Sequence, residues 1–226
     1  MSPDVDRPGP GPLLREEDLL GPVDVVAPFL LGCWLITERP EGNVALRLTE
    51  VEAYSGEGQD PASHAHRGPT PRAEIMFGPP GRLYVYFSYG IHWCANVVVG
   101  PEGRGSAVLL RAGEIMVGEE LARARRPAAR VARDLARGPA RLAQALGVGP
   151  DDRGRDLLSA AGPVRLHRGR APVTVSAGPR VGISQATDLP WRFWETGAPS
   201  VSVFRAGGKG RVGRQQGRPA GQDGAL

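Results

Sequence analysis

The amino-acid sequence predicts an α+β fold: a single domain with a curved, mostly antiparallel β-sheet that is flanked by helices. Two observations support this class. Most segments with strand character are joined by short turns, and the segments with helical character lie in the middle of the chain instead of alternating with strands. The chain has 226 residues, of which 41% are hydrophobic, so it is long enough to bury one substantial core.

The two ends of the chain differ from its centre in composition. Residues 1–13 are rich in proline and predict a flexible N-terminal arm. Residues 206–226 are rich in glycine and arginine and predict a disordered basic tail, which could contact nucleic acid or simply be solvated. The residues between them, 14–205, are expected to form the folded domain.

Local patterns of apolar residues predict the first elements. An apolar run at 25–31 indicates a short helix that Asp24 could cap, and a short strand is expected at 33–37. Residues 43–54 alternate between apolar and polar side chains, which is typical of a strand, and the polar residues 55–81 predict a long loop. Segments rich in aromatic and β-branched residues predict further strands at 82–89, 92–99 and 106–111.

Two helices are expected in the middle of the chain. The first covers 118–126 and is ended by Pro127, because proline cannot continue a helix. The second starts near Pro139 and ends at Gly147, a residue type that commonly terminates helices. Short strands are then expected near 163–167, 172–176, 179–183 and 200–204.

Arginine supplies almost all of the positive charge. The formal net charge of +4 favours an anionic partner, although an arginine-rich codon usage would produce the same composition. Arginine is suited to bidentate contacts with phosphate. Lys209 is the only lysine and lies in the tail, so a mechanism that needs a lysine amine is nearly excluded.

Cysteine usage and hydropathy exclude several protein classes. Cys33 and Cys94 both lie in apolar runs, a pattern that gives neither a disulfide framework nor a zinc site and favours a reducing cytosol. No apolar run approaches the roughly 18 residues of a membrane-spanning helix. The proline-rich start of the chain also lacks the pattern of a signal peptide.

One face of the strand at 43–54 changes character along its length. Its even-numbered side chains begin with Val44, Leu46 and Leu48 and continue as Glu50, Glu52 and Tyr54. A carboxylate at the point where a buried face enters a cleft could act as a general base. The alternative is a strand that simply reaches solvent at Glu50.

Arg111 closes the apolar run at 107–111. A buried arginine needs an anionic partner. It could pair with Glu52, hold a water molecule or form a purely structural salt bridge.

The loop at 55–81 carries histidines and arginines. His64 and His66 have a spacing that could bind a metal ion, but the rest of a ligand set is missing, so we predict no metal site and favour an imidazole hydrogen bond to a ligand. Arg67 and Arg72 are flanked by glycine and proline, which gives a stiff basic loop suited to phosphate or an ordinary solvated loop.

Aromatic residues are concentrated in one segment. Tyr84, Tyr86, Phe87, Tyr89 and Trp93 lie within ten residues. A core strand would also contain aromatic residues but would favour phenylalanine, whereas amphipathic rings suit stacking on nucleic-acid bases at a wet site. Tyr86 and Tyr89 have opposite parity, so one could line a pocket while the other projects outward.

Several separated motifs, in this order, resemble those of the alkyladenine (3-methyladenine) DNA glycosylase family. The resemblance extends from about Leu14 to Arg205. The motifs are Thr49-Glu50-Val51-Glu52-Ala53-Tyr54, Ser63-His64-Ala65, Thr70-Pro71-Arg72, Met76-Phe77, Leu83-Tyr84-Val85-Tyr86, Tyr89-Gly90, Asn96, Val108-Leu109-Leu110-Arg111-Ala112, Gly138-Pro139-Ala140-Arg141-Leu142 and Arg180-Val181-Gly182-Ile183.

The resemblance implies an enzyme of base excision repair. Such an enzyme flips alkylated or deaminated purines, of the 3-methyladenine type and with hypoxanthine as a candidate, out of duplex DNA and hydrolyses the N-glycosidic bond to leave an abasic site. It implies double-stranded DNA with a damaged base as partner, no cofactor, a monomeric state, no membrane association, and a cytoplasmic location at the nucleoid. Because Lys209 is the only lysine, we expect a monofunctional glycosylase without lyase activity.

The resemblance also implies roles for individual residues. Glu52 matches the general base that activates the attacking water, and Arg111 matches a residue that helps to hold that water. Tyr89 matches the side chain that intercalates into the gap left by the flipped nucleotide. Arg141 matches a phosphate contact, alongside the arginines of the 55–81 loop.

The same resemblance assigns a base pocket. Tyr54, His64 and Tyr86 match residues that enclose the flipped base, and Asn96 matches a residue that screens its exocyclic groups. Two rival interpretations remain open: a non-catalytic nucleic-acid binding module that uses the same tyrosines and arginines, and a hydrolase of free nucleosides.

Overall fold

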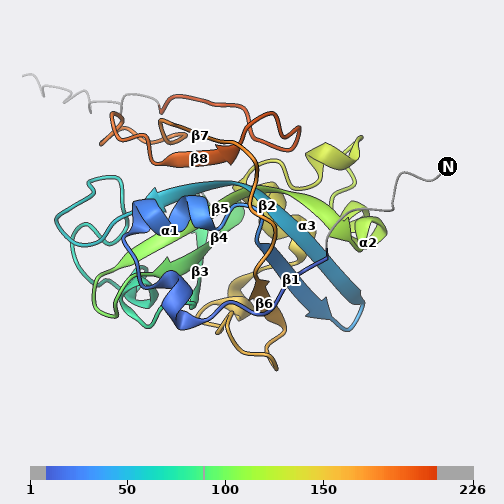
Figure 1. Cartoon of the computed structure of the whole chain (residues 1–226), viewed down its shortest axis with the longest axis horizontal. Helices are drawn as coiled ribbons and strands as arrows, with labels where there is room; N and C mark the ends of the chain where they lie inside the picture. The colour runs from blue at the N-terminus through green and yellow to red at the C-terminus, as the bar shows by residue number, and fades with distance from the viewer. Residues whose placement is uncertain (1–8, 89, 208–226) are drawn as a thin grey trace, which may run out of the picture.

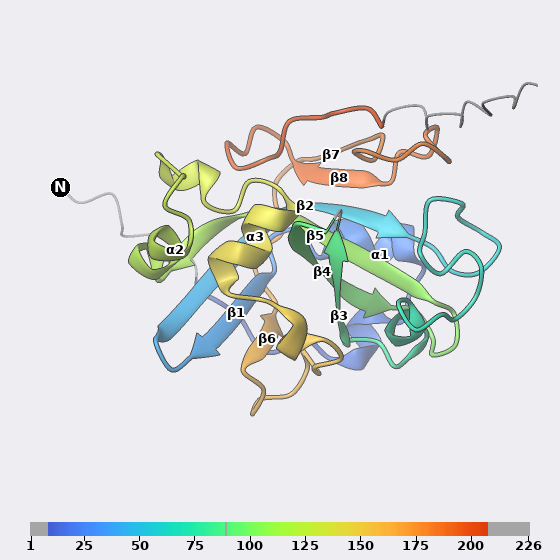
Figure 2. The ribbon, with the colours of Figure 1, turned by 180° about the vertical axis from the view of Figure 1, so that it is seen from behind.

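An eight-stranded, antiparallel and curled β-sheet organises the chain, which confirms the predicted α+β class. The computed structural model describes residues 9–88 and 90–207. Six strands follow one another across the sheet in the order β3-β4-β5-β2-β1-β6, and β8 pairs with both β2 and β7. Figures 1 and 2 show α1 on one side of the curled sheet and α3 on the other.

The bounds of the elements follow the sequence patterns closely in the first half of the chain. The strands are β1 (Trp34–Arg39), β2 (Gly42–Tyr54), β3 (Leu83–Ser88), β4 (His92–Val99), β5 (Ser106–Val117), β6 (Val164–His167), β7 (Val175–Gly178) and β8 (Arg192–Glu195). The helices are α1 (Val23–Phe29), α2 (Glu119–Arg125) and α3 (Pro139–Leu146). Within the described residues, no helix has the length and apolar character needed to cross a membrane.

A bulge in β2 decides which side chains face the core. The register of β2 against β5 shifts on both sides of Glu50. Leu48 before the shift and Val51 and Ala53 after it all belong to the main apolar cluster, so the core-facing side chains change from even to odd numbers. The expectation of one continuous even-numbered face was therefore wrong, because a bulge turns the strand about its axis. It leaves Glu50 and Glu52 on the opposite face, both fully buried.

Two of the expected short strands are also wrong. Residues 179–183 and 200–204 form no strand, whereas β8 was not expected at all. The first segment contains Pro179 and Gly182, which has a positive φ of 75°. The second segment is held by side-chain contacts instead of a ladder, such as the bond from the Ser202 amide to Glu50.

The chain ends extend the fold or lie outside it. Of the arm expected at 1–13, residues Gly11 and Pro12 exchange backbone hydrogen bonds with Arg168, and Leu13 bridges to His167 beside β6. Residues 1–8 of that arm, and positions 208–226 of the basic tail with Lys209, lie outside the described residues.

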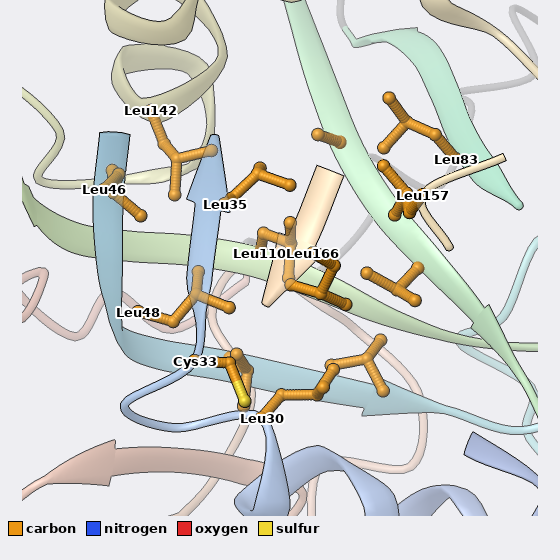
Figure 3. Close-up of a cluster of buried hydrophobic side chains, with 14 of the residues drawn as sticks. Leu30, Cys33, Leu35, Leu46, Leu48, Leu83, Leu110, Leu142, Leu157 and Leu166 are labelled. Carbon is orange, nitrogen blue, oxygen red and sulfur yellow. The ribbon is translucent and has the colours of Figure 1, made fainter. Parts of the chain in front are cut away.

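Helix α3 shows how the local sequence builds the core. Pro139 opens the helix and Gly147 ends it in the left-handed conformation, with a φ of 65°. Between them Leu142 and Leu146 recur at helical spacing and are completely buried. Figure 3 shows Leu142 in the same cluster as the leucines of the strands, so this helix is fixed against the sheet and holds its N-terminal end beside the cavity described below.

Replacing Leu142 by alanine should lower the free energy of unfolding by about 2–5 kcal/mol, because a buried leucine leaves a cavity that the sheet cannot fill. Urea denaturation of both proteins measures the difference. The neighbouring exposed Arg141→Ala should change the stability by less than about 0.5 kcal/mol. Equal effects of the two substitutions would contradict the packing of α3 described here.

Candidate functional site

A cavity of about 550 Å³ opens between the strands and the loop that joins β2 to β3. This volume lies in the range of pockets that bind small molecules. Most of the residues that the sequence singled out as pocket or catalytic residues line it, namely Tyr54, His64, Tyr86, Asn96 and Arg111, and Arg72 joins them. The structure therefore brings together side chains that lie up to about sixty positions apart in the sequence.

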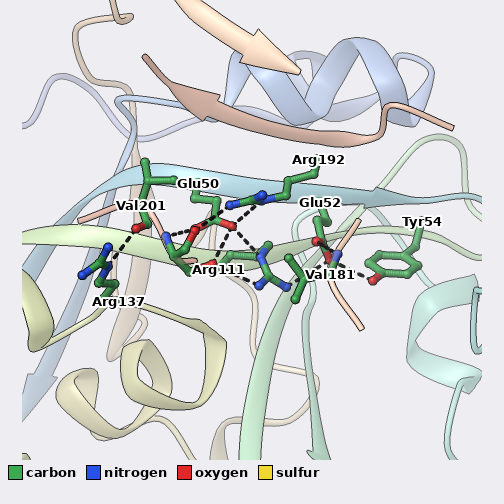
Figure 4. A network of polar contacts seen from close by, with 9 residues as sticks. Glu50, Glu52, Tyr54, Arg111, Arg137, Val181, Arg192 and Val201 are labelled. Atoms are coloured by element: carbon green, nitrogen blue, oxygen red, sulfur yellow. Dashed lines mark hydrogen bonds and ion pairs between the residues drawn. The ribbon is translucent and has the colours of Figure 1, made fainter. Parts of the chain in front are cut away.

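Glu52 lies behind the wall of this cavity. It is completely buried, and its carboxylate accepts a hydrogen bond of 2.9 Å from the Tyr54 hydroxyl and one of 2.7 Å from the Val181 amide. The guanidinium of Arg111 lies 3.2 Å away, as one of the sequence interpretations proposed. All three partners line the cavity, and Figure 4 shows them around the carboxylate.

Burial and these three partners shift the pKa of Glu52 in opposite directions. Burial raises its pKa above the ordinary glutamate value, whereas Arg111 in the first place, then the Val181 amide and the Tyr54 hydroxyl, lower it. The pKa of the Tyr54 hydroxyl is itself raised, by burial and by the charge of Glu52. Tyr54 therefore remains a hydrogen-bond donor at neutral pH.

Glu50 anchors the other side of Arg111. Its carboxylate accepts bonds of 2.7 Å from both Arg111 Nε and Arg192 Nε, and bonds of 2.6 and 2.8 Å from the amide and hydroxyl of Ser202. Burial by itself would raise the pKa of Glu50, but these partners, with Arg111 the strongest, bring it below the ordinary value. Glu50 is therefore ionised at neutral pH and lies between the guanidinium groups of Arg111 and Arg192.

A second buried ion pair fixes Tyr54 from behind. The guanidinium of Arg180 lies 4.6 Å from the centroid of the Tyr54 ring and forms a bidentate pair of 2.6 and 2.8 Å with Asp60. Arg180 also donates to the Ala53 carbonyl at 2.9 Å and is only 2% exposed. Sequence reasoning missed this pair, although Arg180 belongs to one of the quoted motifs.

The aromatic wall of the cavity is joined by hydrogen bonds and ring contacts. His64 Nδ1 lies 3.0 Å from the Tyr84 hydroxyl, and its ring meets that of Tyr86 edge-on with centroids 4.6 Å apart. The guanidinium of Arg72 lies 5.1 Å from the Tyr86 centroid and donates to the Phe87 carbonyl at 3.3 Å. Partial burial and the charge of Arg72 lower the pKa of His64 to about 4, so its imidazole is neutral at pH 7.

Asn96 lies on β4, between β3 and β5, and lines the floor of the cavity. It is 4% exposed, and its amide nitrogen donates to the Tyr84 carbonyl at 3.0 Å. This bond fixes the orientation of the side chain toward the cavity that it lines. Sequence reasoning also missed the other side of the cavity, where Val181, Gly182 and Ile183 line it.

Two of the expected phosphate contacts lie away from the cavity lining. Arg67 is exposed on the β2–β3 loop, and Arg141 is exposed on the first turn of α3, whose Pro139 lines the cavity. Tyr89, the expected intercalating residue, lies outside the described residues. Among the residues that the structure describes, no group of three histidine, cysteine or acidic side chains could hold a metal ion.

Comparisons with known proteins agree with one another. Residues 17–199 match the family model described as methylpurine-DNA glycosylase (MPG). The chain is 52% identical over 212 residues to a protein of Leifsonia xyli subsp. xyli, covering 91% of this chain and 97% of the relative. It is 53% identical over 209 residues to a protein of Streptomyces avermitilis, with coverages of 89% and 96%. Both relatives carry the name "Putative 3-methyladenine DNA glycosylase".

A titration of the histidine ring signals by NMR tests the electrostatics of the cavity wall. The signals of His64, assigned by their loss in His64→Gln, should titrate at about pH 4. Arg72→Gln should raise this pKa toward the ordinary value of about 6.5, because it removes a neighbouring positive charge. The same substitution at the exposed Arg67 is the control and should leave it unchanged. A His64 pKa of about 6.5 in the unmodified protein would contradict this account.

Proposed function

The chain belongs to the methylpurine-DNA glycosylase family and acts as a glycosylase in DNA repair, and we propose that it releases alkylated purines of the 3-methyladenine type, and the deaminated purine hypoxanthine, from duplex DNA. The reaction is hydrolysis of the N-glycosidic bond and leaves an abasic site. The observation that carries this proposal is a buried carboxylate, Glu52, held by three donors directly behind an aromatic-lined cavity.

The damaged nucleotide is rotated out of the duplex before it reacts. A base inside the helix cannot reach a cavity with buried catalytic groups, and unstacking costs a few kcal/mol. We assign to Tyr89 the role of filling the gap that the nucleotide leaves, since an inserted side chain offsets part of this cost. In the sequence, position 89 falls between the end of β3 at Ser88 and the start of β4 at His92, and Gly90 is in the left-handed conformation with a φ of 67°.

The extruded base enters between the aromatic side chains of the cavity. Tyr54, backed by Arg180, offers a ring of fixed orientation, and His64 and Tyr86 form the facing wall. The neutral imidazole of His64 can accept or donate a hydrogen bond without adding charge. Asn96 at the floor would meet the exocyclic groups of the base and so exclude purines whose groups do not fit.

Glu52 is the general base of the proposed reaction. As the bond to the base breaks, the sugar gains positive charge, as in other glycosidic cleavages, and water attacks its anomeric carbon. Glu52 accepts the proton of that water, and its negative charge stabilises the cationic sugar. Burial raises the pKa of Glu52, which makes its carboxylate a stronger base. Arg111 keeps the carboxylate ionised and helps to hold the water.

Arginines carry the contacts with the DNA backbone in this proposal. Arg67 and Arg141 are exposed on either side of the cavity, on the β2–β3 loop and on α3, where they can reach phosphates. Arg72 lies closer, at the cavity itself, and so contacts the phosphates nearest to the flipped nucleotide. We propose that the protein acts as a monomer, without a cofactor, on the DNA of the cytoplasmic nucleoid.

Glu52→Gln should lower the single-turnover rate constant for excision of hypoxanthine from a duplex oligonucleotide by at least about 100-fold, because the amide cannot accept the proton. Binding to the damaged duplex should change little, since the residue does not line the cavity. The exposed Glu102→Gln is the matched control and should keep the full rate.

Other outcomes of that experiment identify the rival functions. Unchanged excision in Glu52→Gln would refute the assigned role of the carboxylate. Binding of damaged duplex without any excision by the unmodified protein would indicate a binding module. Release of bases from free nucleosides at the same rate as from duplex DNA would indicate a nucleoside hydrolase.

The enzyme should cut only the glycosidic bond. Lyase activity uses an amine to form a Schiff base with the sugar, and the chain contains one lysine, Lys209. Borohydride reduction during turnover should therefore trap no covalent complex with DNA, and the abasic product should keep an intact backbone. A trapped complex that disappears in Lys209→Arg would show that the enzyme is bifunctional.

A further inference from the structure

We propose that Ser202 is a positioning residue for catalysis: its hydroxyl group fixes the guanidinium of Arg111 in the orientation that holds Glu52. The inference rests on the proposed function of Glu52. Ser202 lies beyond the family match, which ends at residue 199, so it belongs to a segment that the match does not cover. We call residues 200–202 the C-terminal strap.

Each residue of the strap is attached to a different part of the fold. The Ser200 hydroxyl lies 2.9 Å from the hydroxyl of Thr49 on β2, and the Val201 carbonyl accepts a bond of 2.8 Å from Arg137 Nε. The Ser202 amide donates to Glu50 at 2.6 Å. Figure 4 shows Arg137 and Val201 beside the carboxylate network. The strap is thus docked by contacts that do not need the Ser202 hydroxyl.

The Ser202 hydroxyl alone joins the strap to the catalytic guanidinium. It accepts a bond of 3.1 Å from Arg111 Nη2 and donates one of 2.8 Å to Glu50. A hydroxyl has one hydrogen to donate and lone pairs to accept with, so both bonds form together. The hydroxyl therefore links Arg111 to Glu50 in addition to their direct ion pair.

All three nitrogens of Arg111 then have a defined partner. Nε is bound to Glu50 at 2.7 Å, Nη2 to Ser202 at 3.1 Å, and Nη1 lies 3.2 Å from Glu52. Because the guanidinium is planar, these contacts fix its position and its rotation. Without the Ser202 hydroxyl, Nη2 is left in a buried site without this acceptor. Glu50 is then free to draw the guanidinium away from Glu52.

A displaced Arg111 changes the proton affinity of Glu52. Arg111 is the strongest of the influences that oppose burial at Glu52, so weakening this contact raises the pKa of that carboxyl further. The acidic limb of the pH–rate profile should therefore move to higher pH. The charged or titratable groups around the pair are Glu50, Tyr54, Arg180 and Arg192, and the Ser202 substitution leaves all four in place.

The experiment compares Ser202→Ala with Ser200→Ala in the full chain. Both remove one hydroxyl from the strap, but Ser200 does not contact Arg111 in the described contacts. We expect Ser202→Ala to lower the single-turnover excision rate about tenfold near neutral pH, with its acidic limb shifted upward and its affinity for damaged duplex unchanged. Ser200→Ala should keep the profile of the unmodified enzyme, and Ser202→Thr, which keeps the hydroxyl, should restore most of the rate.

The outcomes separate this inference from the function on which it rests. If the unmodified protein excises no damaged purine, the proposed function fails. If it does, but Ser202→Ala and Ser200→Ala give the same profile, or the loss appears only in binding, the positioning role of Ser202 is refuted. If Ser202→Ala unfolds at a lower temperature, Ser202→Thr decides: failure of the threonine variant to recover the rate refutes the role of the hydroxyl.

Discussion

The sharing of Arg111 between two buried carboxylates is the interaction on which the candidate site depends. A guanidinium and a carboxylate lose several kcal/mol of hydration when they are buried, and their ion pair and hydrogen bonds must offset this loss. Glu50 and Glu52 both lie on β2, and the bulge beside Glu50 turns them onto the face where Arg111 of β5 lies. The network therefore links the sheet, β8 and the C-terminal strap around one charge.

The aromatic side chains of the cavity are also held by polar groups. Tyr54 is held by Arg180 behind its ring and by Glu52 at its hydroxyl, and Tyr84 holds His64. Side chains held in this way need little rearrangement when a ligand enters, which is the condition for efficient positioning of a substrate.

The sequence allowed the class of the fold and the main strands to be predicted, because alternation and residue type are local signals. Most of the cavity residues, such as Tyr54, His64 and Asn96, were assigned through the family resemblance of their motifs. The bulge beside Glu50 was not predicted, since it depends on the pairing of β2 with β5. The Arg180–Asp60 pair joins positions that are 120 residues apart, and no local pattern reveals such a contact. The apparent strand at 200–204 gives no local sign that the Ser202 side chain is bound in a charge network.

The protonation state of Glu52 in the free enzyme tests the central claim most directly. The side-chain carboxyl carbon of ¹³C-labelled glutamate reports this state by NMR, and its signal can be assigned by its loss in Glu52→Gln. The account predicts a carboxylate at neutral pH whose pKa lies above the ordinary value of about 4.3. Burial raises this pKa, whereas Arg111, the Val181 amide and the Tyr54 hydroxyl stabilise the ionised form. A Glu52 that is protonated at neutral pH would contradict the assignment of this residue as the base.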